Sequence, residues 1–290
     1  MPWLQLRLSA TSENTETLSE LLTEAGALAV TLRDAGDTPL LEPGPGETPV
    51  WPETIVIGLF EADSNMDRVI QSLSQSTGTK LQYQLEPLED KDWERAWMDN
   101  YHPMSFGQRL WICPSWSTPP QPEAINLMLD PGLAFGTGTH PTTSLCLEWL
   151  DQHDITGLDV IDYGCGSGIL AIAAALLGAR HVWAIDHDPQ ALIATQTNAK
   201  QNRVQEKITV GRPDELPDLQ SNLVLANILA GPLMSLAPVI AEHTKSGGQL
   251  VLSGLLEKQA LEVSTHYQPW FKMSAPRKKD DWVLLEGKKA

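Results

Sequence analysis

The feature that most constrains the fold is a glycine-rich turn between an apolar strand and an apolar helix. Residues 158–162 have the character of a short buried strand, the turn GCGSG follows at 164–168, and the apolar run 169–177 has the length of a buried helix. Glycine has no Cβ, so a turn of this composition lets a ligand approach the main chain closely. The arrangement predicts the first strand–turn–helix unit of a ligand-binding α/β sheet.

A carboxylate follows at the distance expected for the next strand. The apolar residues 182–185 are predicted to form this strand, which ends on Asp186, 22 positions after Gly164. An acid in this place can accept hydrogen bonds from both ribose hydroxyls of a nucleoside ligand, and it repels a 2′-phosphate, which disfavours NADP. Asp188 and Pro189 are predicted to be the N-cap and first residue of the next helix. The turn and the acid at matched spacing predict a nucleoside-cofactor site, although each alone is compatible with an ordinary turn or cap.

The spacing of the glycines distinguishes between cofactors. A dinucleotide fingerprint has glycines at the first, third and sixth places, whereas here the sixth place is Ile169 and the third glycine falls at the fifth, Gly168. The form G-x-G-x-G with an acid two places earlier, Asp162, is typical of methyltransferases that use S-adenosylmethionine. An NAD-dependent oxidoreductase and a non-catalytic module with a vestigial cofactor fold are the alternatives from other classes.

The first ninety residues follow a different pattern. Alternating apolar residues predict four strands and apolar residues at helical spacing predict two helices, at residues 4–8, 18–25, 28–32, 55–60, 66–73 and 81–85. The resulting order β-α-β-β-α-β predicts a small ferredoxin-like α+β domain. Apolar strand candidates alternate with helical patterns after residue 125, which predicts a mostly parallel sheet covered on both faces.

Three regions are therefore expected along the chain. Residues 1–86 are predicted to be the ferredoxin-like domain, residues 87–123 a linker helix and connecting segment, and residues 124–290 a Rossmann-like α/β domain. Trp93 and Trp97 are four residues apart, so they would share one face of the linker helix.

The charge of the chain is strongly acidic and unevenly distributed. The net charge is −17, and residues 1–90 hold four Lys or Arg against fifteen Asp or Glu. Such a surface repels phosphate backbones and suits a basic partner, so direct nucleic-acid binding is not expected. A role in solubility alone also explains the acidity. Three cysteines without metal-ligand spacing, no apolar run of membrane length and no leader-like start predict a cytoplasmic protein with free thiols. We expect a monomer without a metal site.

Two further segments lie where a ligand would bind. Residues 129–145 read LDPGLAFGTGTHPTTSL, a glycine-rich loop followed by a helix that begins at His140 or Pro141 and carries Thr143 in its first turn. The free N–H groups of that turn would point at the ligand. A strand over residues 222–225 leads to Asn227, whose amide would face the crevice at the carboxyl end of the sheet. A capping role for the threonines and a turn role for Asn227 remain open alternatives.

Together these blocks resemble the ribosomal protein L-11 methyltransferase (PrmA) family. The resemblance rests on LDPGLAFGTGTHPTTSLCLEWL, VIDYGCGSGILAIAAALLGA, AIDHDPQAL and VLANILAGPL, and it covers essentially the whole chain. It implies a class I methyltransferase fold, S-adenosylmethionine as cofactor, and methylation of lysine side chains and the N-terminal α-amine of a basic ribosomal large-subunit protein. It also implies that the small domain recognises this substrate. Tyr163 stands where Phe is frequent, a change that keeps the ring.

The predicted site follows from the resemblance and the glycine pattern together. The resemblance assigns cofactor binding to Thr143, Gly164, Asp186 and Asn227, and the glycine pattern adds Asp162, Gly166 and Gly168.

The acceptor amine must be neutral before it can take the methyl group, so Asn227 is expected to orient it, with His140 as a second candidate for proton acceptor. A methyltransferase acting on a small molecule or a nucleic-acid base is the closest alternative. The acidic first domain and the missing aromatic residue after Asn227 count against the nucleic-acid version.

Overall fold

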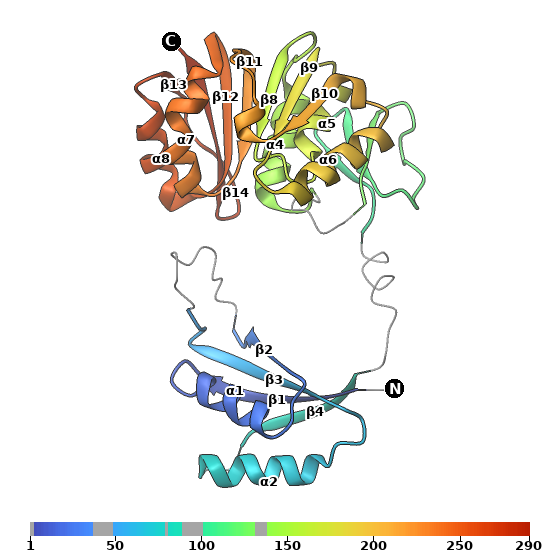
Figure 1. Cartoon of the computed structure of the whole chain (residues 1–290), viewed down its shortest axis with the longest axis vertical. Helices are drawn as coiled ribbons and strands as arrows, with labels where there is room; N and C mark the ends of the chain where they lie inside the picture. The colour runs from blue at the N-terminus through green and yellow to red at the C-terminus, as the bar shows by residue number, and fades with distance from the viewer. Residues whose placement is uncertain (1–2, 37–48, 79–80, 89–100, 131–137) are drawn as a thin grey trace. The chain divides into compact units, whose positions relative to one another are not determined.

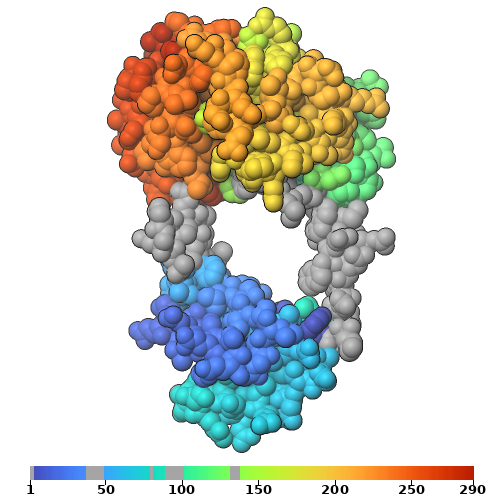
Figure 2. Space-filling view, viewed as in Figure 1, coloured from blue at the N-terminus to red at the C-terminus, as the bar shows by residue number. Residues whose placement is uncertain are grey.

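The computed structural model describes residues 3–36, 49–78, 81–88, 101–130 and 138–290. The chain divides into two compact units, Met1–Trp97 and Met98–Ala290, and each is considered by itself (Figure 1). The space-filling view shows that side chains fill the space between the ribbons within each unit (Figure 2). No helix in the described ranges has the length and apolar character needed to cross a membrane.

The first unit is a four-stranded antiparallel sheet with two helices in the predicted order β-α-β-β-α-β. The sheet order is β2-β3-β1-β4, and the elements are β1 (Trp3–Thr11), α1 (Thr15–Glu24), β2 (Ala29–Asp34), β3 (Glu53–Phe60), α2 (Met66–Thr77) and β4 (Tyr83–Leu88). Leu6 of β1 packs in one buried cluster with Leu22 of α1 and Leu73 of α2. Both helices therefore cover the same face of the sheet.

The second unit is built on an eight-stranded sheet. Its order is β10-β9-β8-β11-β12-β15-β13, with β14 paired to β15. The first five strands in this order are parallel, and the pairs that involve β15 are antiparallel. The strands are β8 (Asp159–Tyr163), β9 (His181–Ile185), β10 (Ile208–Gly211), β11 (Ser221–Asn227), β12 (Thr244–Leu256), β13 (Phe271–Met273), β14 (Arg277–Lys279) and β15 (Trp282–Lys289). The mostly parallel Rossmann-like sheet expected from the sequence is confirmed.

Helices cover both faces of this sheet. Helices α4 (Pro141–Gln152), α5 (Ile169–Leu176) and α6 (Pro189–Gln201) lie on one face, and α7 (Ala230–Glu242) and α8 (Ala260–Tyr267) on the other. Val160 of β8 belongs to the core on the first face and its neighbour Ile161 to the core on the second. Because both faces are buried, these two adjacent residues are both apolar instead of alternating with polar ones. Short 3-10 turns η2 (Gln205–Lys207), η3 (Pro213–Glu215) and η4 (Glu257–Gln259) complete the unit.

The segment expected to connect the two domains is partly built into the second unit. Strands β5 (Met104–Phe106) and β6 (Leu110–Cys113) lie within residues 87–123 and form a three-stranded sheet with β7 (Ile125–Met128). Leu110 and Ile112 are fully buried in the core of this unit. The sequence did not predict β5 and β6, because strands of three or four residues are too short to show a clear period. The predicted linker helix with its two tryptophans falls on residues 89–100, outside the described residues.

Candidate active site

The glycine loop joins the end of β8 to the start of α5. Gly164, Gly166 and Gly168 have φ values of 80°, 55° and 79°, a region in which L side chains are strained. A Cβ on Gly164 would lie 2.3 Å from Cγ2 of Ile228, and one on Gly168 would lie 2.7 Å from Cγ2 of Thr195. Conformation and close packing therefore both require glycine at the first and last of these positions.

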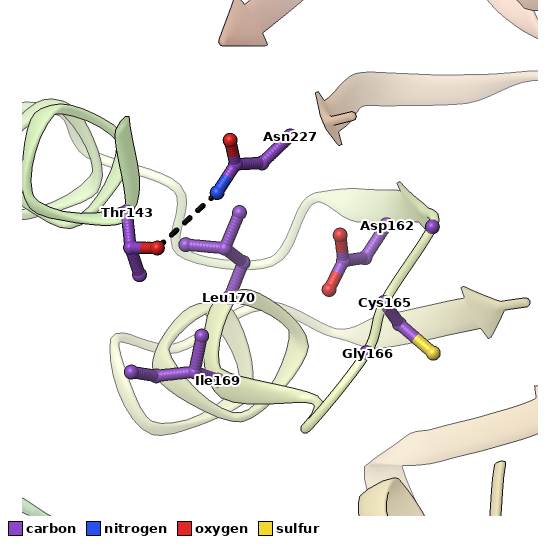
Figure 3. Close-up of a pocket in the computed structure, with 8 residues that line it drawn as sticks. Thr143, Asp162, Cys165, Gly166, Ile169, Leu170 and Asn227 are labelled. Atoms are coloured by element: carbon purple, nitrogen blue, oxygen red, sulfur yellow. Dashed lines mark hydrogen bonds between the residues drawn. The ribbon is translucent and has the colours of Figure 1, made fainter. Parts of the chain in front are cut away.

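A pocket opens beside this loop (Figure 3). Its lining residues are Thr143, Asp162, Gly164, Cys165, Gly166, Ile169, Leu170 and Asn227. The structure thus brings together five predicted site residues from three stretches of the chain: Thr143 from the first, Asp162, Gly164 and Gly166 from the second, and Asn227 from the third. Of the other three candidates, Gly168 is the last glycine of the loop but does not line the pocket, Asp186 holds the loop through the amide of Gly166, and His140 caps α4.

Asp162 is the buried acid of the pocket. Its Oδ2 accepts a hydrogen bond from the amide of Ala171 at 3.0 Å, whereas its Oδ1 is buried and has no partner among the described residues. Burial raises the pKa of Asp162 to about 7, the bond from Ala171 acts against this rise, and the nearby Asp186 adds to it. A cationic donor beside Oδ1 would satisfy the oxygen and favour the charged form.

Asn227 reaches the same pocket from the end of β11. Its Nδ2 donates to Oγ1 of Thr143 at 3.3 Å, across the gap shown in Figure 3. Thr143 is fully buried in the first turn of α4, so this bond fixes which way the amide points. The Oδ1 of Asn227 is also buried without a partner in the described part of the chain. Both unpartnered atoms are acceptors, so the pocket fits a ligand that brings N–H or O–H donors and positive charge.

Asp186 fastens the glycine loop to the end of β9. Its Oδ2 accepts from the amide of Gly166 at 2.9 Å and its Oδ1 from the amide of Asp188 at 3.0 Å. Each carboxylate oxygen has a second acceptor position, so Asp186 can also bind hydroxyl groups of a ligand. Asp188 caps α6 by accepting from the amide of Gln190 at 2.9 Å, which confirms the predicted helix start.

His140 has the contacts of a helix cap. Its Nδ1 lies 2.8 Å from Oγ1 of Thr142, and the amide of Thr142 donates to it at 3.4 Å. The ring also packs edge-on against Trp282, with 4.7 Å between centroids. Burial lowers the pKa of His140, so its imidazole is neutral at pH 7. The N-cap of α4 is therefore His140, whereas a capping role for the threonines was one of the alternatives that the sequence left open.

Two residues of α6 support the glycine loop and were not singled out from the sequence. The hydroxyl of Thr195 donates to the carbonyl of Gly166 at 3.0 Å, and Nδ2 of Asn198 donates to the carbonyl of Ser167 at 2.8 Å. Thr195 is fully buried on the face that also carries Ala191. Thr195 is a polar residue on an otherwise apolar helical stripe, which marks it as unusual, but its sequence neighbours do not indicate which group it contacts.

The three cysteines, Cys113, Cys146 and Cys165, are free and buried. Burial is the largest cause that raises the pKa of the Cys165 thiol, and its Sγ lies 3.4 Å from Oγ1 of Thr195. These contacts favour a packing role over a nucleophilic one.

Comparison with known proteins identifies the family. The family model described as ribosomal protein L11 methyltransferase (PrmA) matches residues 2–290. The chain belongs to this family. A ribosomal protein L11 methyltransferase of Shewanella sp. (strain ANA-3) is 54% identical over 292 residues, covering 100% of both chains, and one of Shewanella woodyi is 54% identical over 290 residues, covering 99% of both. The crystal structure of a ribosomal protein L11 methylase from Lactobacillus delbrueckii subsp. bulgaricus is 32% identical with a TM-score of 0.60, covering 65% of this chain and 99% of that one.

Membership of the L11 methyltransferase family makes the chain an enzyme that uses S-adenosylmethionine, and the pocket fits this group. The cofactor carries an ammonium group and a sulfonium, which supply the donor and the positive charge that Oδ1 of Asp162 lacks, and two ribose hydroxyls that can donate to Asp186. Asp162 would hold the ammonium group, Asp186 the ribose, and the glycine loop would lie against the nucleoside. When bound, the cofactor supplies an electrophilic methyl group.

Proposed function

We propose that this enzyme methylates lysine side chains and the N-terminal α-amine of ribosomal protein L11. The names of its relatives support L11 as the substrate. The observation that carries the choice of amines is the buried, unpartnered Oδ1 of Asn227 in the pocket that fits the methyl donor. An amine brings the N–H donor that this oxygen lacks.

The chemistry demands a neutral, well-oriented amine. The pKa of a free lysine is near 10.4, so only about one molecule in a few thousand is neutral at pH 7. Transfer to such an amine is an in-line displacement, in which positioning contributes most of the rate. Because Nδ2 of Asn227 is held by Thr143, its Oδ1 is left to accept an N–H of the amine and to direct the nitrogen lone pair at the methyl group.

The proton of the substrate ammonium group then has two routes. In the first it passes to water, and in the second His140 accepts it. Burial lowers the pKa of His140, which makes its imidazole a weaker base, and its Nδ1 is already engaged with Thr142. We therefore assign orientation to Asn227 and favour water as the proton acceptor.

The first unit is proposed to recognise the basic substrate. Its helix α1 carries Glu16, Glu20 and Glu24 on exposed positions and contains no Lys or Arg. Acidic side chains of this kind attract a basic protein and repel RNA, which supports a protein substrate bound without direct nucleic-acid contact. A ribosomal-protein substrate also supports action in the cytoplasm.

The Asn227→Ala variant tests the amine assignment. We expect kcat at saturating S-adenosylmethionine to fall roughly 100-fold, the usual order for loss of one aligned polar group at a reacting centre. Affinity for S-adenosylhomocysteine, measured by calorimetry, should change far less. Mass spectrometry of methyl-labelled L11 should place the label on amines. Unchanged turnover, or label found only on RNA, would remove the proposal.

A triple variant tests the role of the first unit. Changing Glu16, Glu20 and Glu24 to Gln should raise KM for L11 several-fold at low salt, and the difference should shrink at high salt because salt screens exposed charges. The matched control changes three exposed acids of the second unit, Glu206, Glu242 and Glu262, to Gln. Equal KM values for the two triple variants would contradict recognition by α1.

A further inference from the structure

Ile228 follows Asn227 directly and lies between two glycines. Its Cγ2 occupies the space beside Gly164, where an added Cβ would lie 2.3 Å away. Its backbone occupies the space beside Gly254, where an added Cβ would lie 2.3 Å from the carbonyl oxygen, 2.7 Å from the carbonyl carbon and 2.8 Å from the nitrogen of Ile228. Ile228 thus touches the glycine loop with its side chain and β12 with its main chain.

The contact with Gly254 begins where the strand ladder ends. The parallel pairing of β11 with β12 runs to Asn227 opposite Ser253, and Gly254 is the next residue along β12. Gly254 has a φ of 87° and Gly164 a φ of 80°, so both glycines combine a left-handed backbone with a close neighbour. The turn after Asn227 is therefore held on two sides by positions that no larger residue can occupy without a shift.

We propose that Ile228 is a positioning residue for methyl transfer, which sets the spacing between the glycine loop and Asn227. The loop lies against the methyl donor and Asn227 orients the acceptor amine, so this spacing determines how the two reacting atoms meet. The inference rests on the proposed role of Asn227. A purely space-filling Ile228 would affect the stability of the fold but not turnover by the folded enzyme.

Gly254→Ala and Gly247→Ala form a matched pair for testing this role. Both residues lie in β12 with left-handed φ values, 87° and 74°, but a Cβ on Gly247 meets nothing within 4 Å. Both variants carry the same backbone strain, and only Gly254→Ala pushes on the backbone of Ile228. We expect Gly254→Ala to lower kcat at least 10-fold, with affinity for S-adenosylhomocysteine changed less than about threefold, and Gly247→Ala to keep the wild-type kcat.

Ile228→Ala and Ile228→Val give a second test that does not depend on Gly254→Ala folding. Valine keeps a methyl group in the place of Cγ2, so it should retain kcat, whereas alanine should lower kcat several-fold without changing affinity for S-adenosylhomocysteine. Thermal midpoints of all four variants separate turnover from stability. Wild-type kcat for Gly254→Ala or Ile228→Ala would overturn the positioning role. An active Asn227→Ala enzyme would instead overturn the proposed function on which it rests.

Discussion

Strand β8 carries an Asp near each of its ends, and strand β11 carries an Asn near each of its ends. The side chains at the amino ends have hydrogen-bond partners that those at the carboxyl ends lack. At the amino ends, the carboxylate of Asp159 accepts from Nε of Arg180 at 2.8 Å and from Nζ of Lys245 at 3.4 Å. Oδ1 of Asn222 accepts from the amide of Asp159 at 3.1 Å and from the same Lys245 at 3.2 Å. At the carboxyl ends, Asp162 and Asn227 each leave one buried oxygen without a partner in the described part of the chain.

This difference in hydrogen-bond partners indicates that Asp159 and Asn222 have a structural role, whereas Asp162 and Asn227 are available to bind a ligand. Arg180, through its hydrogen bond, holds the pKa of Asp159 below its ordinary value, whereas burial raises the pKa of Asp162 to about 7. Leaving a buried acceptor unpaired costs about 1–3 kcal/mol. In the described part of the chain, Arg180 and Lys245 supply cations at the amino ends, whereas Asp162 and Asn227 at the carboxyl ends each leave an oxygen without a donor, so these oxygens mark where a ligand belongs.

The largest effect should come from Asp162→Asn. Loss of the carboxylate removes the charge that faces the ammonium group of the cofactor, so we expect affinity for S-adenosylhomocysteine to fall roughly 100-fold in calorimetry at pH 8. The thermal midpoint of the ligand-free protein should not fall, because the amide avoids a buried charge. Wild-type affinity in this variant would contradict the ligand-binding role of Asp162 and so the difference proposed between the two ends of the strands.

The pH dependence of stability should have opposite signs for the two acids. The folded protein holds the proton of Asp162 more tightly than the unfolded chain, whose Asp pKa is about 3.9. Asp162 therefore makes the free energy of unfolding fall by about 1.4 kcal/mol per pH unit between about pH 4 and about pH 7, and adds no slope above that. For Asp159 the folded pKa is lowered, so its contribution is present above about pH 4 and lost as the pH falls through the folded value.

Denaturant titrations from pH 5 to pH 8 measure this contrast. The stability of Asp162→Asn relative to wild type should increase toward pH 7 and then level, whereas the difference for Asp159→Asn should stay flat across the range. If the stability of both variants relative to wild type were independent of pH, Asp162 and Asp159 would not differ in their pKa shifts.

Asp159→Asn should destabilise the fold without touching the pocket. We expect a loss of about 1–2 kcal/mol in the free energy of unfolding, because Lys245 and the largely exposed Arg180 lose a charged partner that water replaces only in part. Affinity for S-adenosylhomocysteine should stay within about twofold of wild type. A large loss of affinity would mean that the amino ends also act on the ligand.

Thr195→Val should give the smallest change. The variant keeps the shape of the side chain beside Gly168 but removes the hydroxyl that donates to the carbonyl of Gly166. We expect KM for S-adenosylmethionine to rise a few-fold, the equivalent of about 1 kcal/mol, with kcat unchanged. Thr197→Val, on an exposed position of the same helix, is the control. Identical KM values for the two variants would argue that α6 does not support the loop.

The parts of the site that follow from local sequence were predictable. The glycine turn, the start of α4 and the Asp188 cap depend on neighbouring residues, so their signals appear in a single stretch of chain. The family blocks added Thr143 and Asn227, which lie 84 residues apart and meet in one hydrogen bond.

The parts that depend on tertiary contacts were not predictable. Thr195 supports a loop about 30 residues earlier, and Gly254 is constrained by Ile228, which lies in the turn after β11. The residues that neighbour Thr195 and Gly254 in sequence do not indicate these tertiary contacts. Strands β5 and β6 were missed for a related reason, because their pairing with β7 rather than their own period defines them.

The burial of Cys113, Cys146 and Cys165 has a practical consequence. Burial is the largest cause that raises the pKa of each thiol, and alkylating reagents attack the thiolate, so the native chain should be almost unreactive to maleimides. A cysteine introduced at an exposed position of α1 and another at an exposed position of α6 could then be labelled selectively with a donor and an acceptor dye. Energy transfer between them would report, in solution and during turnover, how far the unit proposed to hold the substrate lies from the unit that holds the methyl donor.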